Sequence, residues 1–132
     1  MIILDTHIWI WWVHGDSKLP KEYQAYLQEH EKQEFGVSII SCWEIAKLVQ
    51  YNRLELPCSI SEWFNQALLS PYIRLIDLTT EIIIESTQLP DPFHKDPTDQ
   101  LIVATARYYH CPLMTVDRKL LGYSSVENVP IK

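Results

Sequence analysis

The sequence predicts an α/β fold in which a mainly parallel central sheet is covered by helices on both faces. Short apolar runs alternate along the chain with longer stretches that have the apolar spacing of helices. This alternation is typical of parallel strands joined by crossover helices, and both faces of such a sheet are buried. Of the 132 residues, 47% are hydrophobic, which is enough for the core of one domain spanning residues 1–132.

The first strand is expected at residues 2–4, an apolar run that is too short for a helix and that Asp5 ends. A helix over residues 6–13 follows and is apolar nearly all round, with three tryptophans. These tryptophans either fill the core or contribute to a protein interface, where tryptophan is enriched. A loop over residues 14–20 then leads into a helix that begins at Pro20 and extends to about residue 32.

The second strand is expected at residues 35–40. Ser41 and Glu44 follow with the spacing of a capping box, which predicts that a helix begins there and ends near residue 50. The next elements are expected at residues 60–69 (a helix capped by Ser59 or Ser61), 73–78 (a strand) and 79–85 (a helix capped by Thr79).

A longer helix is expected from Pro97 to about residue 110. Asp96 is a suitable N-cap, Pro97 suits the first helical position, and Asp99 has the spacing to reach back in a capping box. Both aspartates are thus explained as caps. The alternative is that Asp99 points a carboxylate from the helix N-terminus into a cleft.

The prolines around Asp91 predict an irregular segment at residues 89–93. The last strand is expected at residues 113–116, where Asp117 ends it. One helical turn at residues 118–121 and an edge strand at residues 126–131 complete the chain.

The cysteines and the first residues of the chain indicate the cellular compartment in which the protein is expected. The three cysteines, Cys42, Cys58 and Cys111, form no C-x-x-C pair. This indicates neither a zinc ribbon nor a disulfide framework, and free thiols are typical of a reducing compartment. Residues 1–7 lack the basic segment of a signal peptide, and no stretch approaches the ~20 apolar residues of a membrane span. We therefore expect a cytoplasmic protein.

The net charge of −6 argues against a broad electrostatic contact with nucleic acid. It permits local basic patches, or a phosphate substrate held through a divalent metal. A cluster of acids used as metal ligands would itself make a small chain acidic.

Four acidic residues are expected near one edge of the sheet. Asp5 and Asp117 end strands, Glu44 lies in the first turn after the second strand, and Asp99 opens the helix before the last strand. Each has an explanation as a cap, although Asp5 caps no obvious helix. Several crowded carboxylates resist ionising together unless a cation lies between them. Oxygen ligands without a Cys or His pattern suit Mg²⁺ or Mn²⁺, which serve phosphoryl transfer.

Four stretches together resemble the PIN domain, and within it the VapC-type ribonuclease toxins of prokaryotic toxin–antitoxin pairs. They are Leu4-Asp5-Thr6-His7 with its Trp-rich continuation, Ser41-Cys42-Trp43-Glu44-Ile45-Ala46, residues 94–106 and Thr115-Val116-Asp117-Arg118. The resemblance implies a three-layer α/β/α PIN-like fold with a central, mainly parallel sheet. It also implies a divalent-metal-dependent endoribonuclease, a homodimer and an antitoxin partner.

The resemblance further implies roles for single residues. The metal-site acids are Asp5, Glu44, Asp99 and Asp117, and the supporting residues are Thr6, Asp96 and Thr115. Gln100 departs from the basic residue that is common at its position. Lys47, Lys95 and Arg118 lie nearest the acids and are candidates for contacts to the RNA backbone, unless they are ordinary solvated surface. Independently of the resemblance, two roles are open for His7 and His94, that of a general acid or base and that of a hydrogen-bonding brace, and the brace is favoured.

Two other functions remain open on the sequence. One is a catalytically inactive PIN-like dimeric binding module with a residual acidic pocket. The other is a metal-dependent phosphatase or a phosphoacceptor receiver domain, because both place acids at strand ends. A phosphatase usually has a second aspartate where this chain has His7, and a receiver has paired acids after its first strand, which this chain lacks. Asp77 alone matches a receiver's mid-chain acid.

Overall fold

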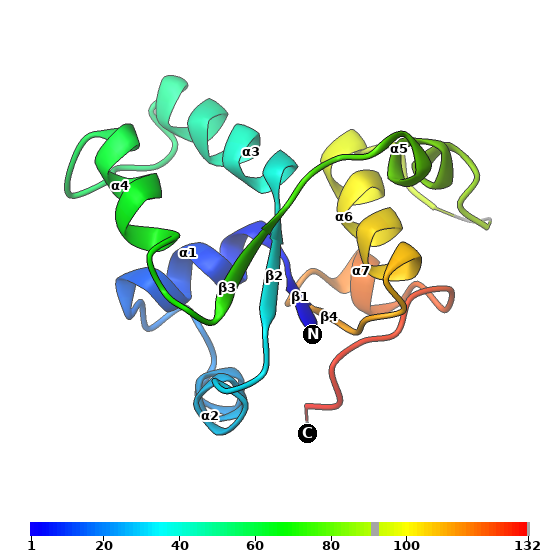
Figure 1. Ribbon diagram of the computed structural model, residues 1–132, viewed down its shortest axis with the longest axis horizontal. Coiled ribbons are helices and arrows are strands. Elements are labelled where there is room, and N and C mark those ends of the chain that lie inside the picture. Colours follow the sequence, from blue (N-terminus) through cyan, green and yellow to red (C-terminus); the bar gives the residue numbers. More distant parts are fainter. Residues whose placement is uncertain (91–92, 132) are drawn as a thin grey trace.

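The core of the fold is a four-stranded parallel sheet with the strand order β3-β2-β1-β4 (Figure 1). The computed structural model describes residues 1–90 and 93–131. In the register, Ile3 pairs with Gly36 of β2 on one side and with Leu113 of β4 on the other, so β1 is central. The strands are β1 (Ile2–Leu4), β2 (Phe35–Ser38), β3 (Ile73–Ile76) and β4 (Leu113–Met114).

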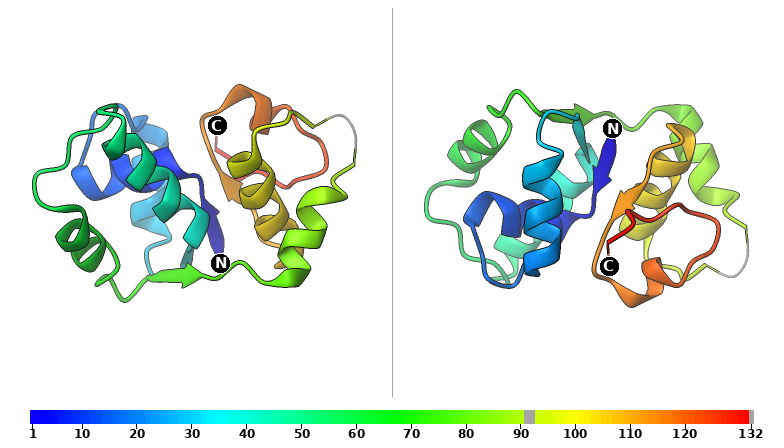
Figure 2. Two further views of the ribbon diagram at one scale, coloured as in Figure 1. Left: turned by 90° about the horizontal axis from the view of Figure 1, so that it is seen from above. Right: turned by 90° about the horizontal axis from the view of Figure 1, so that it is seen from below.

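Helices cover both faces of the sheet and make three layers, as predicted (Figure 2). Side chains alternate along β1, so that Ile2 and Leu4 face one core and Ile3 faces the other. The first core is completed by α1 (Thr6–His14), α2 (Lys21–Glu29), α3 (Ile39–Gln50) and α4 (Ile60–Ala67). The second is completed by α5 (Thr80–Thr87), α6 (Pro97–Tyr108) and α7 (Arg118–Leu121).

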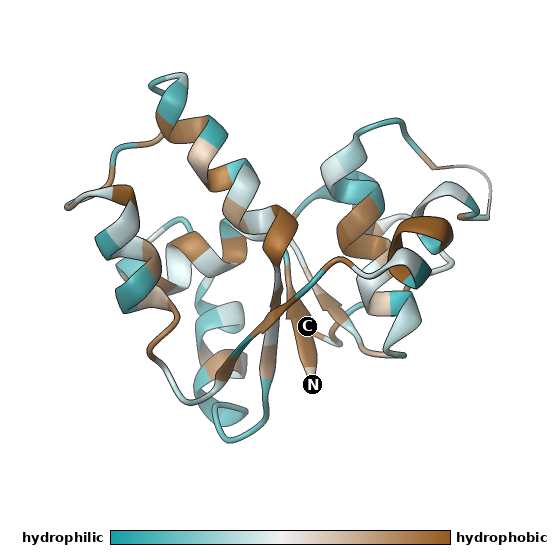
Figure 3. Cartoon of the chain, turned by 45° about the horizontal axis from the view of Figure 1, so that its top comes forward, coloured by the Kyte–Doolittle hydropathy of each residue, from teal (hydrophilic) through white to brown (hydrophobic). Residues whose placement is uncertain are grey.

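Apolar strands lie between helices whose outer surfaces carry many hydrophilic residues (Figure 3). Trp9 of α1 is fully buried in the first core, with its ring edge-on to Trp63 at a centroid distance of 5.2 Å. Trp11 and Trp12 are half-buried against the same core. Trp9 therefore fills the core. Within the described residues, no helix combines the length and the apolar character needed to cross a membrane.

The caps of two helices differ from the sequence prediction, and for α3 the start of the helix differs as well. Asp5 caps α1 by accepting from the backbone N–H of Thr6, because β1 passes directly into the helix. In α3 the cap is Ser38 and not Ser41, because β2 ends at Ser38 and its hydroxyl oxygen accepts from the N–H of Ile40. The helix thus begins before Ser41, and Glu44 lies beyond its first turn, so the predicted capping box does not form.

The helices capped by Ser59 and Thr79 form as predicted. The expected edge strand at residues 126–131 is wrong: this segment makes one parallel bridge, between Leu113 and Asn128, and Pro130 has no N–H to extend it. In the predicted irregular segment 89–93, residues 91 and 92 lie outside the described residues. The predicted strands at residues 35–40 and 113–116 are shorter in the structure, ending at Ser38 and Met114.

Candidate active site

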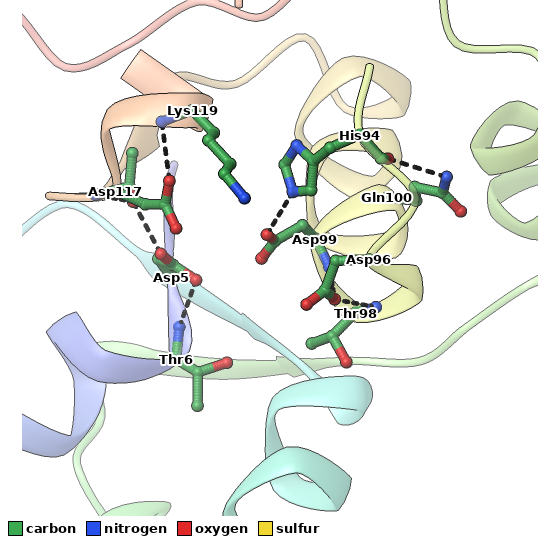
Figure 4. Close-up of polar contacts among 10 residues, drawn as sticks. Asp5, Thr6, His94, Asp96, Thr98, Asp99, Gln100, Asp117 and Lys119 are labelled. Carbon is green, nitrogen blue, oxygen red and sulfur yellow. Dashed lines mark hydrogen bonds and ion pairs between the residues drawn. The ribbon is translucent and has the colours of Figure 1, made fainter. Parts of the chain in front are cut away.

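The carboxyl ends of the strands and the N-terminus of α6 bring acidic side chains to one edge of the sheet (Figure 4). The N–H of Asp5 continues the β1–β4 pairing by donating to the carbonyl of Met114 at 2.9 Å. This bond places the residue after β1 beside the residues after β4. In Figure 4, Asp5 and Asp117 lie on one side of a shared space and Asp99 lies on the other. Parallel sheets bind ligands at this edge.

Asp5 is buried and held by two hydrogen bonds. Its Oδ1 accepts from the N–H of Thr6 at 2.9 Å, and its Oδ2 accepts from the hydroxyl of Thr115 at 2.7 Å. The hydroxyl oxygen of Thr115 in turn accepts from the N–H of Asp117 at 3.0 Å. Burial raises the pKa of Asp5, the bonds from Thr115 and Thr6 oppose this, and the charge of Asp117 adds to it. The position of Asp5 is therefore fixed before any ligand binds.

Asp117 is the N-cap of α7. Its Oδ1 accepts from the N–H of Lys119 at 2.8 Å, and its side chain is half-buried. The cap uses Oδ1, so Oδ2 is free of the helix. Asp117 can therefore cap α7 through Oδ1 and still offer Oδ2 to a ligand.

Glu44 projects from α3 and is half-buried. The hydroxyl of Thr6 donates to Oγ of Ser41, one turn before Glu44, at 2.8 Å and so ties α1 to α3. The pKa of Glu44 is raised by burial first, and the charges of Asp5 and Asp99 raise it further. Glu44 therefore lies within electrostatic reach of acids from two other segments.

The two aspartates at the start of α6 behave differently. Asp96 is the exposed N-cap, and its Oδ1 accepts from the N–H groups of Thr98 and Asp99. Asp99 does not reach back to Asp96 as a capping box requires. Its Oδ2 lies 2.6 Å from Nε2 of His94 instead. Gln100 supports this arrangement by donating from Nε2 to the carbonyl of His94 at 3.1 Å.

The pKa of Asp99 is raised, mainly by burial, and the charges of Asp5 and Asp96 add to the shift while His94 opposes it. Within residues 1–90 and 93–131, the acids Asp5, Glu44, Asp99 and Asp117 form no ion pair with a lysine or arginine. Three buried or half-buried carboxyl groups thus have raised pKa values, mainly because they are buried and further because other acids lie near them. A cation would relieve that cost.

The donor chemistry fits a hard divalent cation, since the carboxylates supply oxygen ligands. The side chains do not yet converge: in the part of the chain that the structure describes, no three His, Cys, Asp or Glu residues are placed to hold one ion together. Three of the acids instead accept hydrogen bonds from separate partners: Asp5 from Thr115, Asp99 from His94 and Asp117 from the N–H of Lys119. Two cavities of about 600 and 360 Å³ lie beside Arg107 and Phe35, and none of the four acids lines either of them.

The PIN domain family model matches residues 2–124 of this chain. The chain belongs to the PIN domain family. It is 30% identical over 122 residues to Ribonuclease VapC22 of Mycobacterium tuberculosis (strain ATCC 25618 / H37Rv), an alignment that covers 92% of this chain and 91% of the relative.

Solved structures share the PIN fold at lower identity. VapBC2 from Rickettsia felis, bound to a DNA fragment from its promoter, contains a chain with a TM-score of 0.70 and 18% identity, covering 98% of each chain. A toxin–antitoxin complex from Klebsiella pneumoniae contains one with a TM-score of 0.68 and 20% identity, covering 96% of this chain and 95% of that one. These likenesses confirm the predicted three-layer fold.

The basic residues expected to contact RNA form no ion pair with the four acids among the residues that the structure describes. Lys95 and Arg118 are exposed at the starts of α6 and α7, and Lys47 is half-exposed on α3. In Figure 4 the side chain of Lys119 also points toward the space beside Asp117. Sequence reasoning did not choose Lys119 among the candidates for RNA contacts, because spacing alone does not show the direction of its side chain.

Sequence reasoning also missed Ser41 as the link between α1 and α3, because its spacing to Glu44 imitates a capping box. His94 was expected as a brace and does contact Asp99. His7, the other expected brace, is exposed and stands 5.8 Å from the ring of Trp11. Asp77, which a receiver-like function would need, is exposed beyond the edge strand β3.

Proposed function

We propose that this PIN domain, comprising residues 1–132, is a divalent-metal-dependent endoribonuclease and the toxin of a toxin–antitoxin pair. One observation carries the proposal: acids from four separate segments lie near one edge of the sheet, and the pKa values of Asp5, Glu44 and Asp99 are raised by burial and by neighbouring acids. The name of the relative Ribonuclease VapC22 and the toxin–antitoxin complexes among the structural neighbours support the same function.

In this proposal Asp5, Glu44, Asp99 and Asp117 hold Mg²⁺ or Mn²⁺. Such an ion activates a water molecule and stabilises the charge that develops on phosphate oxygens. Thr115 positions Asp5, and Thr6 positions it through its N–H, so both act as supporting residues. Asp96 supports the site by capping α6 and so fixing the first turn that carries Asp99. His94 orients Asp99 through the 2.6 Å contact.

The substrate is RNA, which we propose is positioned by contacts from Lys47, Lys95 and Arg118 to backbone phosphates. These three residues lie on α3, before α6 and on α7, the elements that also carry the acids. Without such local contacts, a chain with a net charge of −6 would repel a polyanion. Phosphate contacts of this kind fix the position of the strand and carry no sequence information.

The proposal extends to partners and compartment. We propose a homodimer and an antitoxin that covers the acidic edge. Half-buried Trp11 and Trp12 supply apolar surface for protein contacts. We also propose a cytoplasmic location, since Cys42, Cys58 and Cys111 are all free thiols.

A catalytically inactive binding module with the same fold is the competing function. It predicts that RNA binds without being cut. A metal-dependent phosphatase is disfavoured by the membership in the PIN family and by the absence of a second aspartate at His7.

The test is cleavage of a labelled RNA hairpin by the purified protein with Mn²⁺, with Mg²⁺ and with EDTA. We expect cleavage with a divalent ion and none with EDTA. Binding without cleavage at any divalent ion concentration would favour the inactive module. Release of phosphate from small phosphomonoesters, without cleavage of RNA, would favour the phosphatase.

A further inference from the structure

An exposed aromatic stripe runs along α3, away from the acidic edge. Trp43, Lys47 and Tyr51 recur every four residues, and this spacing places them on one face of a helix. Trp43 is 52% exposed and Tyr51 is 64% exposed, whereas Ile45 on the opposite face is fully buried. The stripe begins at Trp43, which lies on the same turn of α3 as Glu44, one of the proposed metal-site acids.

Lys47 joins the two rings. Its ammonium nitrogen lies 5.7 Å from the ring centroid of Trp43 and 5.7 Å from that of Tyr51, and it donates to Oε1 of Gln50 at 3.1 Å. The two centroids are therefore separated by no more than twice that distance. About three stacked nucleotides cover this span, at roughly 3.4 Å each.

The negative net charge of the chain favours an RNA-binding surface that relies on aromatic side chains more than on phosphate contacts. A net charge of −6 limits how much affinity for RNA can come from phosphate contacts. Base stacking on aromatic side chains does not depend on net charge, because every base has a π-face. An aromatic pair with one lysine between its rings offers two stacking faces and one phosphate contact on the same helix.

We propose that Trp43, Lys47 and Tyr51 form a base-stacking platform that holds a single-stranded segment of the RNA substrate and leads it to the acids beside Glu44. The proposal rests on the endoribonuclease function proposed above and names its substrate class as single-stranded RNA. Trp43 and Tyr51 are positioning residues that hold bases, and Lys47 holds a phosphate between them.

A second protein chain is the other occupant that exposed aromatic residues fit. Two observations favour RNA. The stripe carries a cation at its centre and not an apolar side chain, and cations complement phosphates. It also starts on the same turn of α3 as Glu44, close to where the proposed reaction would take place.

The test is fluorescence anisotropy with a fluorescein-labelled ten-nucleotide oligouridylate in Mg²⁺, with every protein carrying Asp99→Asn to prevent cleavage. We expect Trp43→Ala and Tyr51→Ala each to weaken binding by about tenfold, the effect of losing one stacked base. Trp43→Phe and Tyr51→Phe should retain most of the affinity. Tyr108→Ala is the matched control, since Tyr108 is an exposed tyrosine at the far end of α6, and it should bind as before.

An oligouridylate with abasic positions in its centre tests stacking itself. The protein with Trp43 and Tyr51 intact should bind it about tenfold more weakly than the full oligouridylate. The double variant Trp43→Ala/Tyr51→Ala should bind both probes equally. Lys47→Gln should reduce the dependence of log affinity on log salt by about 0.7, the value of one phosphate contact on a single strand.

Several outcomes would overturn the platform. These are no binding of the oligouridylate, unchanged binding by the folded double variant, or equal binding of the abasic and full probes with the aromatic residues intact. A double variant that loses self-association in sedimentation but keeps its affinity for the oligouridylate would assign the stripe to a protein interface.

The stacking platform and the ribonuclease function can be rejected independently of each other. With Asp99 restored, we expect Trp43→Ala to raise KM for RNA cleavage and to leave kcat close to that of the parent protein. Cleavage with an unchanged KM would reject the platform and leave the nuclease standing. Specific stacking without any cleavage by the parent protein would reject the nuclease and leave the platform standing.

Discussion

The hydroxyl of Thr115 donates to the carboxylate of Asp5 at 2.7 Å, across a separation of 110 residues in sequence. The same hydroxyl oxygen accepts from the N–H of Asp117 at 3.0 Å. One side chain thus links the residues that follow β1 and β4 and sets the distance between two of the proposed metal-site acids. The link exists because β1 and β4 pair in parallel and end together.

Replacing Thr115 by valine keeps the shape of the side chain and removes both hydrogen bonds. We expect Thr115→Val to destabilise the protein by about 1–3 kcal/mol, because the buried carboxylate of Asp5 loses a donor. Thr115→Ser retains the hydroxyl and is the matched control, so its loss should be smaller. Urea unfolding of the two variants measures the difference. Equal stability of the valine variant and the parent protein would show that the link does not stabilise the fold.

Asp5→Asn tests whether the four acidic side chains repel one another when no metal is bound. Asparagine still caps a helix, and the substitution removes a charge from a crowded buried site. We expect the variant to melt higher than the parent protein in EDTA and to gain less from Mn²⁺. For the parent protein, metal at ~100 times the dissociation constant adds about 2.7 kcal/mol, or several degrees in Tm. Equal metal shifts in both proteins would mean that Asp5 does not belong to a metal cluster.

The stability of the metal-free protein should fall as the pH rises. Burial raises the pKa of Asp5, Glu44 and Asp99 above the usual values of 3.8, 4.5 and 3.8. The folded state therefore binds these protons more tightly than the unfolded state. Their contribution to stability is fully present below the usual pKa values and is lost as the pH rises through the raised ones.

Melting in EDTA from about pH 4 upward measures this slope. The decline should be shallower in Asp5→Asn, which has one such group fewer. A decline of the same steepness in both proteins would place its origin outside this cluster. In Mn²⁺ the trend should reverse, because ionised carboxylates bind the ion better.

The form of the nucleic acid provides another test. Single-stranded or looped RNA can present a phosphate to a sheet edge more readily than a stiff duplex can. Because the chain is acidic, binding to duplex DNA should be weak and lost at moderate salt. We expect a structured RNA to be cut in its loops with Mn²⁺, as mapped on a sequencing gel. Efficient cutting of duplex DNA under the same conditions would contradict this substrate assignment.

The sheet and its acidic edge were predictable because short apolar runs ended by acids leave few arrangements in an α/β fold. For that reason Asp5 directly follows β1, and Asp117 lies between the end of β4 and the start of α7. The start of α3 was not predictable, because Ser38 and Ser41 are both suitable caps. Pairing of β2 with β3 up to Ser38 decides between them.

Details of the site depend on contacts that sequence spacing does not encode. Asp99 has the spacing of a capping residue, yet it contacts His94, because the segment before α6 folds back over the helix start and Gln100 holds it there. Likewise, the spacing of Ser41 and Glu44 is that of a capping box, yet Ser41 accepts from the hydroxyl of Thr6. At these positions the local sequence is compatible with two different side-chain contacts, and tertiary packing determines which of them forms.

The central claim is that the acids at this edge are a metal-dependent ribonuclease site, and cleavage of an RNA hairpin by Asp99→Asn tests it most directly. Asp77→Asn is the matched control, because Asp77 also follows a strand but is exposed beyond β3. With Mn²⁺ we expect Asp99→Asn to fold like the parent protein and to lose cleavage by orders of magnitude, while Asp77→Asn cleaves normally. Cleavage by folded Asp99→Asn at the parent rate would contradict the account.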